Sequence, residues 1–291
     1  MTIFYGDDKR FLGYFENQKP RAHFGFSSMK TMLNYISSIP SADHNEGFRP
    51  ERKGWYGSYN MNEALHLAKF GWQDGYNLAS KIVSSLSVEH ATEKRKHYDL
   101  AGGRVNVGRM LAGSPTHMIK KKKAESRKII TLFVENAVSS AVRPDNMIIR
   151  AALIGAMIDI MEQRGFSCEI VSVTFQSLKF NSIEHYSQIV TTIKNAGEKL
   201  NLNDIVFALG HPSYFRRFAF ALVCSSDELR TIWRTQGYPS SAFEENTKEY
   251  CVRYLTMFDQ RKLNRNLSII ERARQMFPFV KPHNLEMEFA I

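Results

Sequence analysis

The sequence predicts an α/β protein whose mostly parallel sheet is flanked by helices, with helical additions at its N- and C-terminal ends. From residue 128 onward, compact β-rich runs alternate with apolar patterns at helical spacing. Such alternation is typical of parallel strands joined by right-handed crossovers. Hydrophobic residues form 43% of the 291 residues, while only 9 are Pro and 17 are Gly. This composition supports a well-filled core and argues against a fibrous or disordered chain.

The first half of the alternation is predicted as strand, helix and strand. The run 128–134 is typical of a buried strand, and the helix predicted at 147–164 is apolar almost all round and stops at Gly165. A second β-rich run at 168–175 predicts the next strand. These three elements form the start of an α/β unit.

The second half is predicted as helix, strand and helix. Five residues recur on one helical stripe: Tyr186, Ile189, Val190, Ile193 and Leu200. The apolar run 205–209 then predicts a third strand, and an aromatic helix continues from His211 to about residue 223. Residues 128–225 therefore predict an α/β core with a Rossmann-like order of elements.

The regions on either side of this core are predicted to be mainly helical. In residues 1–93, Asn60 and Glu63 form a capping box ahead of a long helix, in which two glycines one turn apart mark a kink or the close approach of another backbone. In residues 226–291, helical patterns cover 226–233, 243–258 and, as a basic helix, 259–276. We expect this C-terminal region to pack on the core.

Basic residues are in excess. Lys and Arg number 39 against 29 Asp and Glu, which gives a formal net charge of +10 and a pI near 9.4. Such an excess attracts polyanions at long range. The basic texture is densest in residues 94–127, a Gly-rich segment predicted to be a long loop with at most a short helix near 105–111. Basic residues beside aromatic ones favour single-stranded nucleic acid, whose bases are free to stack.

The predicted nucleic-acid-binding residues form two groups. One lies in the Gly-rich segment, and the other opens the aromatic helix after His211, where paired arginines suit phosphate. The residues are Arg104, Arg109, Lys120, Lys121, Lys122, Lys123 and Arg127 in the first group, and Tyr214, Phe215, Arg216 and Arg217 in the second. The alternative for either group is a set of solvated surface charges. If both groups bind, we expect them to line one groove.

Motifs of catalysis are missing from the sequence. It has no P-loop, no nucleophile elbow, no HExxH and no GxGxxG that follows a strand, so we expect no enzyme activity and no cofactor. The three cysteines are far apart, which fits core packing in a reducing compartment and not a zinc site. The acidic start and the absence of a long apolar run predict a cytoplasmic protein that does not enter a membrane.

The end of the first predicted strand resembles a metal site. After Val134 the chain reads Glu-Asn-Ala-Val-Ser-Ser and leads to a long helix, an order similar to the von Willebrand factor A domain. That family holds magnesium with an Asp-x-Ser-x-Ser motif, because this hard cation prefers oxygen ligands. The matching positions are Glu135, Ala137 and Ser139. The resemblance thus implies the scaffold with a degenerate site, and we expect no metal there.

Three further motifs resemble a family of phage proteins of similar length. They are a Trp-Gly-type helix entry between Trp55 and Trp72, a Leu-Ala-Gly-Ser-Pro loop at 111–115, and a His-Pro-x-x-x-Arg-Arg turn at 211–217. A functional relative that this resemblance suggests is the early single-stranded-DNA-binding protein of Enquatrovirus-type podophages. The resemblance implies a factor that binds an open DNA strand and brings a phage RNA polymerase to promoters.

Two other classes of function stay open. A metal-dependent enzyme acting on nucleic acid or nucleotides would use Glu135, Ser139 and Asp204, and a scaffold of the von Willebrand factor A type would bind protein alone. Magnesium-dependent turnover would identify the enzyme. Salt-sensitive binding to oligonucleotides would separate a DNA-binding protein from the scaffold.

Overall fold

The computed structural model describes the greater part of the chain. The described residues are 2–11, 22–40, 53–87, 98–99, 104–119, 129–136, 142–163, 165–180, 183–225, 229–230, 240–241, 251–252 and 271. Of the basic helix predicted at 259–276, only Glu271 is described, and it is helical. Within the described part of the chain, no helix is both long and apolar enough to cross a membrane.

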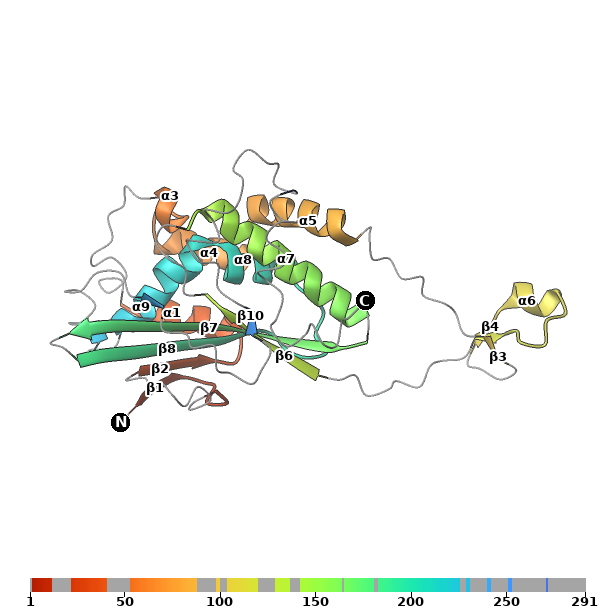
Figure 1. The fold of residues 1–291 in the computed structure, drawn as a ribbon, viewed down its shortest axis with the longest axis horizontal. Coiled ribbons are helices and arrows are strands. Elements are labelled where there is room, and N and C mark those ends of the chain that lie inside the picture. Colours follow the sequence, from red (N-terminus) through yellow and green to blue (C-terminus); the bar gives the residue numbers. More distant parts are fainter. Residues whose placement is uncertain are drawn as a thin grey trace.

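A mixed sheet is the base of the fold (Figure 1). Its strands lie in the order β1 (Ile3–Gly6), β2 (Ala22–Phe26), β8 (Ile183–Lys194), β7 (Ser167–Phe180), β6 (Ile129–Glu135) and β10 (Cys251–Val252), and β9 (Ser240–Ser241) pairs with β7. Neighbours along this order are parallel except β7 and β8, which are antiparallel, as are β7 and β9. The α/β class and the mostly parallel sheet are confirmed.

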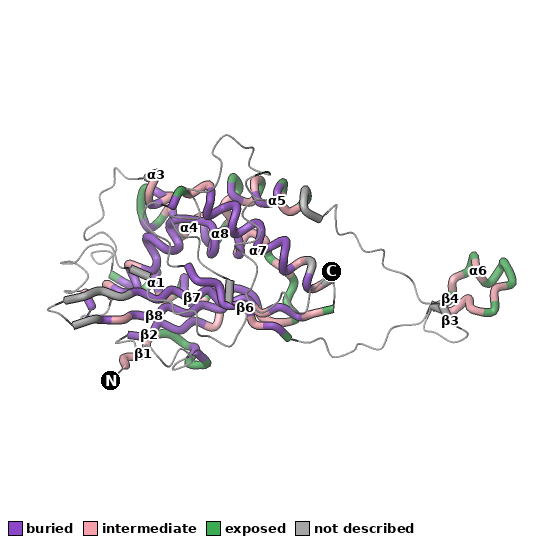
Figure 2. Tube along the Cα trace, in the orientation of Figure 1, coloured by how far each residue is buried: buried purple, intermediate pink, exposed green. Residues whose placement is uncertain are grey.

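Helices cover one face of this sheet (Figure 1). They are α1 (Met29–Ser38), α3 (Lys53–Tyr56), α4 (Met61–Phe70), α5 (Gln73–Ser87), α7 (Pro144–Gln163), α8 (Leu202–Gly210), the π-helix η2 (Tyr214–Phe218) and α9 (Ala219–Ser225). Buried residues concentrate in the sheet and in α7 and α8 (Figure 2). The main core lies between these two layers. We call the sheet and the helices that cover it the body of the protein. Because β1 and β2 extend the sheet, the N-terminal region is part of the body.

The position of α7 explains why its sequence is apolar almost all round. The helix contacts α5, α8 and strand β7, so each of its sides meets another element. Every residue from 146 to 158 is buried. A helix enclosed in this way needs no polar stripe, which is why no amphipathic pattern marks it. The predicted stop is also confirmed, since α7 ends at Gln163 and Gly165, two residues further on, has a φ of 96° that favours glycine.

The structure corrects two elements of the predicted core. Residues 186–194, predicted as part of a helix over 186–200, belong to β8, because this strand is rich in β-branched residues and pairs with β7 along its length. Residues 202–210, predicted to contain a strand, form α8, whose first turn Asn201 caps by accepting from the backbone N–H of Asn203. In a short run whose side chains are all buried, the hydrophobic residues are not spaced with the period of either a strand or a helix. The sequence pattern alone therefore does not distinguish the two. A β7–β8 hairpin therefore replaces one predicted crossover.

A smaller correction concerns the C-terminal region. Residues 251 and 252 lie inside the helix predicted at 243–258, but they form β10 and pair in parallel with β6. This pairing places part of the C-terminal region within the sheet itself. Edge pairing supplies backbone hydrogen bonds that a local helical pattern does not reveal.

The helix predicted after Asn60 is confirmed at its start and broken in its middle. Asn60 accepts from the backbone N–H of Glu63 at 2.8 Å and caps α4. The helix ends at Gly71, whose φ of 97° favours glycine, and α5 begins two residues later. The second glycine, Gly75, lies against the Trp72 ring, where a Cβ would be 2.2 Å from a ring carbon. Gly71 thus breaks the predicted helix, and Gly75 permits the close approach of the Trp72 ring.

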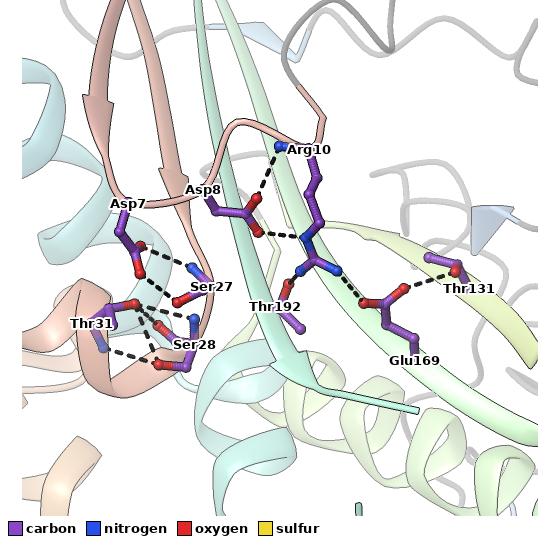
Figure 3. Close-up of polar contacts among 9 residues, drawn as sticks. All are labelled: Asp7, Asp8, Arg10, Ser27, Ser28, Thr31, Thr131, Glu169 and Thr192. Carbon is purple, nitrogen blue, oxygen red and sulfur yellow. Dashed lines mark hydrogen bonds and ion pairs between the residues drawn. The ribbon is translucent and has the colours of Figure 1, made fainter. Parts of the chain in front are cut away.

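A polar network fixes the segment after β1 across the sheet (Figure 3). The Arg10 guanidinium donates to Asp8 at 2.9 Å, to Glu169 of β7 at 2.9 Å and to the Thr192 hydroxyl of β8 at 2.8 Å. Glu169 also accepts from Thr131 of β6 at 2.9 Å. The arginine therefore ties the N-terminal segment to the three central strands.

A buried arginine joins α7 to the ends of two other elements. Arg150 is 1% exposed and donates to the backbone carbonyls of Glu135, at 3.0 Å, and Leu209, at 3.4 Å. It also donates to the side chain of Asn136, which in turn donates to Ser172 and to the Ala208 carbonyl. The carboxyl end of β6 and the last turn of α8 are thus held together through one guanidinium.

We expect Arg150→Ala to destabilise the protein by about 3 kcal/mol or more, because it removes several hydrogen bonds and leaves buried carbonyl groups unpaired. Urea unfolding measures the loss. Arg143→Ala is the control, since its ion pair with Asp145 is exposed and is worth at most about 1 kcal/mol. Equal losses in the two variants would contradict the role of Arg150.

Candidate nucleic-acid interface

The basic charge of the chain is concentrated in residues 94–127. This segment holds ten Lys or Arg residues and two acidic residues, so its net charge is 10 − 2 = +8 of the total of +10. The remaining residues together carry only +2. An attraction to polyanions is therefore a property of this segment far more than of the body, since the field of like charges adds where they cluster.

The described part of this segment forms a small separate unit, the projection (residues 98–99 and 104–119; Figure 1). Its strands are β3 (Tyr98–Asp99), β4 (Arg104–Val105) and β5 (Met118–Ile119), which pair antiparallel in the order β3-β5-β4. The short helix α6 (Val107–Leu111) lies between β4 and β5. The predicted short helix near 105–111 is thus confirmed, and the predicted long loop has more regular structure than expected.

Hydrogen bonds within the projection hold α6 in place. Asn106 caps the helix by accepting from the backbone N–H of Arg109 at 3.1 Å. The Arg109 side chain donates to the Thr116 carbonyl at 3.1 Å and to the hydroxyls of Ser114 and Thr116 at 3.2 Å. Arg109 was predicted to contact nucleic acid, and its guanidinium also closes the turn of the projection. These bonds substitute for a core in a unit too small to have one.

Apolar side chains stand exposed on the projection. Among residues 105–118 none is buried, and the exposed ones include Val107, Met110 and Leu111, at 60%, 47% and 78%. An exposed apolar cluster with a basic surround is typical of a contact surface. The sequence analysis missed these residues, because the run Val-Gly-Arg-Met-Leu is too short to distinguish an exposed helical face from a buried one.

The second predicted group of binding residues lies in the interior. Tyr214, Phe215, Arg216 and Arg217 are between 1% and 4% exposed and belong to η2. The prediction that they line a surface groove with the lysines is therefore corrected. Arg216 and Arg217 pack against the segment 55–58. The burial of all four side chains removes them from contact with an external strand.

This buried arrangement is a clasp between residues 211–217 and residues 55–58. Arg216 donates to the Trp55 carbonyl at 2.6 Å, and its guanidinium lies 4.5 Å from the centre of the Trp55 ring. Arg217 donates to the hydroxyl and the carbonyl of Ser58, both at 2.7 Å, and stacks 4.5 Å from the centre of the Tyr56 ring. Two of the three motifs on which the phage resemblance rests are thus brought together by folding.

His211 belongs to the same clasp and is buried, at 2% exposed. Its ring stacks on Phe207 and meets Trp72 edge-on, with centroid distances of 4.8 and 4.4 Å. Its Nδ1 accepts from the backbone N–H of Ser213 at 3.1 Å, which requires an unprotonated Nδ1. Burial lowers the pKa of His211 to about 3. The ring is therefore neutral and packed, as a structural histidine is.

The remaining predicted site residues are placed as follows. The backbone of Arg104 lies in β4, while Lys120, Lys121, Lys122, Lys123 and Arg127 lie outside the described residues, as do Ala137 and Ser139. Glu135, at the end of β6, is 3% exposed. Asp204 is in the first turn of α8, whereas Glu135 and Asn136 lie beside its last turn. Within the described part of the chain, no group of three or more His, Cys, Asp or Glu is arranged to hold a metal.

The comparisons with known proteins identify a family. The model of a domain of unknown function, DUF7192, matches residues 16–280, and the chain belongs to this family. The matched range includes the projection and most of the body, but not β1. No curated protein and no solved structure matches the chain.

The buried state of His211 predicts an acid sensitivity. His211 binds a proton near pH 6.5 in the unfolded chain and only near pH 3 in the folded protein. Its contribution to the free energy of unfolding is therefore fully present above about pH 6.5, and it falls by about 1.4 kcal/mol per pH unit below that value. His211→Asn keeps an acceptor for Ser213 but does not titrate. Between pH 7.5 and 5, we expect the wild type to lose about 2 kcal/mol more than this variant in urea unfolding.

The comparison between the two proteins isolates His211. Burial also lowers the pKa of His23, but this contribution is common to the wild type and the variant and cancels in the difference. An equal loss of stability in both proteins over this pH range would show that His211 is not the group responsible.

We also expect that magnesium does not stabilise the protein, because position 137 is an alanine and offers no side-chain oxygen to the cation. Thermal unfolding with millimolar magnesium and with a chelator should give the same midpoint. A rise of several degrees with magnesium that disappears in Glu135→Ala would instead place a working site at the end of β6.

Proposed function

We propose that this protein is a non-enzymatic factor that binds single-stranded DNA through the basic segment 94–127. The observation that carries the proposal is the concentration of +8 of the net charge in 34 residues, around a projection in which none of residues 105–118 is buried. Phosphate contacts made by Lys and Arg release condensed counterions, and this release supplies most of the affinity of sequence-independent binding.

The composition of the segment favours a flexible single strand as the ligand. It contains four of the 17 glycines in the chain, at positions 102, 103, 108 and 113. Small residues permit a close approach of the backbone to phosphates. Single-stranded DNA also exposes base faces, to which the apolar side chains of the projection are suited.

A role in phage transcription follows from the resemblance described for the sequence, and we include it in the proposal. Of the three motifs quoted for that resemblance, the loop 111–115 lies in the projection, and the other two form the buried clasp. The proposed partners are an open DNA strand at the projection and a phage RNA polymerase. Capture of a polymerase in a pull-down that survives nuclease treatment is the test of the second partner.

The proposal also includes a von Willebrand factor A-like scaffold for the body. Its support is the order of elements, since β6 leads into the long helix α7 and then into β7, which lies parallel beside β6. In this scaffold the magnesium motif is degenerate, and DNA binding is expected to depend on the basic segment 94–127 and not on this motif.

The binding proposal predicts a steep dependence on salt. With about four or five phosphate contacts, the logarithm of the affinity for a single-stranded oligonucleotide should fall against the logarithm of the salt concentration with a slope of about −3. Replacing all four lysines at 120–123 by Ala should weaken binding and flatten this slope by up to about 3. Titration of a labelled oligonucleotide at three salt concentrations measures both effects.

The control variant removes the same charge from the body. Lys30, Lys69, Lys81 and Lys199 are all exposed there, and their joint replacement by Ala also lowers the net charge by four. We expect this variant to keep most of the affinity and the slope of the wild type. If it loses as much affinity as the 120–123 variant, net charge alone governs binding and the proposed interface is wrong.

A further inference from the structure

We infer that the apolar tip of the projection inserts among the unstacked bases of a single strand, so that the protein recognises exposed bases as well as phosphates. The apolar tip consists of Val107, Met110 and Leu111. The inference rests on the proposed function, because it assigns base recognition to the same site that is proposed to hold the backbone.

The three side chains form one surface. Residues three and four positions apart are neighbours on a helix, so Met110 and Leu111 both lie next to Val107 on α6. All three are exposed, and Val105 at the end of β4 adds a fourth apolar side chain at 39%. Four apolar side chains within seven residues are thus presented to solvent together.

The tip is held in this exposed position by the fold of the projection. Asn106 caps the start of α6, and the chain turns back at Gly113, whose φ is 70°. Arg109 closes the turn by donating to the Thr116 carbonyl. Since none of residues 105–118 is buried, the described projection has no core of its own that could receive the tip.

The surrounding charge identifies the occupant. Residues 100–124 contain six basic residues and no acidic one. A ligand that suits this surface therefore has an apolar part that covers the tip and negative charges on either side of that part. A single strand of DNA has this character, because its base faces alternate with phosphates and are not already stacked on a partner strand. Apolar side chains that enter between bases are an established means of contact with DNA.

The test separates bases from phosphates with two oligonucleotides of equal length. One is an ordinary single strand, and the other has the same sugar-phosphate backbone without bases. We expect the wild type to bind the base-bearing strand about tenfold or more tightly, because contact with bases removes the exposed aliphatic side chains of the tip from water. The double variant Met110→Ser with Leu111→Ser should bind both strands about equally, while its salt slope stays that of the wild type because no phosphate contact is removed.

Two further variants control for general effects. Phe70→Ser removes an apolar side chain that is 75% exposed on α4 of the body, and it should keep the preference for bases. The double variant Met110→Leu with Leu111→Met keeps the tip apolar, and it should also keep the preference for the base-bearing strand. Because the substituted side chains are exposed, we expect urea unfolding of all variants to match the wild type.

The outcomes distinguish the inference from the proposed function. Equal binding of both strands by the wild type overturns the inference and leaves phosphate binding intact. If the Met110→Ser, Leu111→Ser variant still prefers the base-bearing strand, the inference is also overturned and phosphate binding is left intact. The same conclusion holds if that variant keeps this preference but loses binding to a protein partner. Absence of salt-sensitive binding to either strand overturns both the inference and the proposed function.

Discussion

The body of this protein depends on the burial of three arginine side chains. A guanidinium leaves water only where hydrogen bonds replace its hydration, so each of these residues brings several polar groups to a fixed place. Arg150 holds the end of β6 beside the last turn of α8, and Arg216 and Arg217 hold η2 beneath residues 55–58. These bonds join parts of the chain that are up to 161 residues apart, and they set the relative positions of the helices above the sheet.

The projection is built in the opposite way. None of its residues 105–118 is buried, and its shape depends on short strand pairs, a capped turn of helix and the Arg109 side chain. A unit of this kind gains little stability from burial, but it leaves its charged and apolar groups free to meet a ligand. The residues outside 94–127, which include the whole body, are by contrast nearly neutral, with a net charge of +2. Stability and surface chemistry are thus divided between two parts of one chain.

The clasp shows how a motif with functional character can have a structural use. Aromatic residues next to paired arginines are typical of phosphate or base recognition. In the folded protein the same residues pack on Trp55 and Tyr56 and donate to backbone carbonyls. Gly57 is part of this fit, since its φ is 77° and a Cβ there would lie 2.9 Å from the His211 ring. A ring nitrogen that accepts from the backbone and a pKa near 3 leave that histidine unsuited to proton transfer near neutral pH.

The sequence by itself determined the α/β class, the strand β6, the long helix α7 with its stop at Gly165, the cap at Asn60 and the concentration of charge in residues 94–127. These features follow from local chemistry, namely β-rich runs, caps, turn glycines and charge. Only the tertiary structure decided that 183–194 is a strand and 202–210 a helix, because pairing with β7 and burial on all sides outweigh local spacing. It also decided which arginines are buried, since the partners of a guanidinium lie far away in the sequence and no local pattern records them.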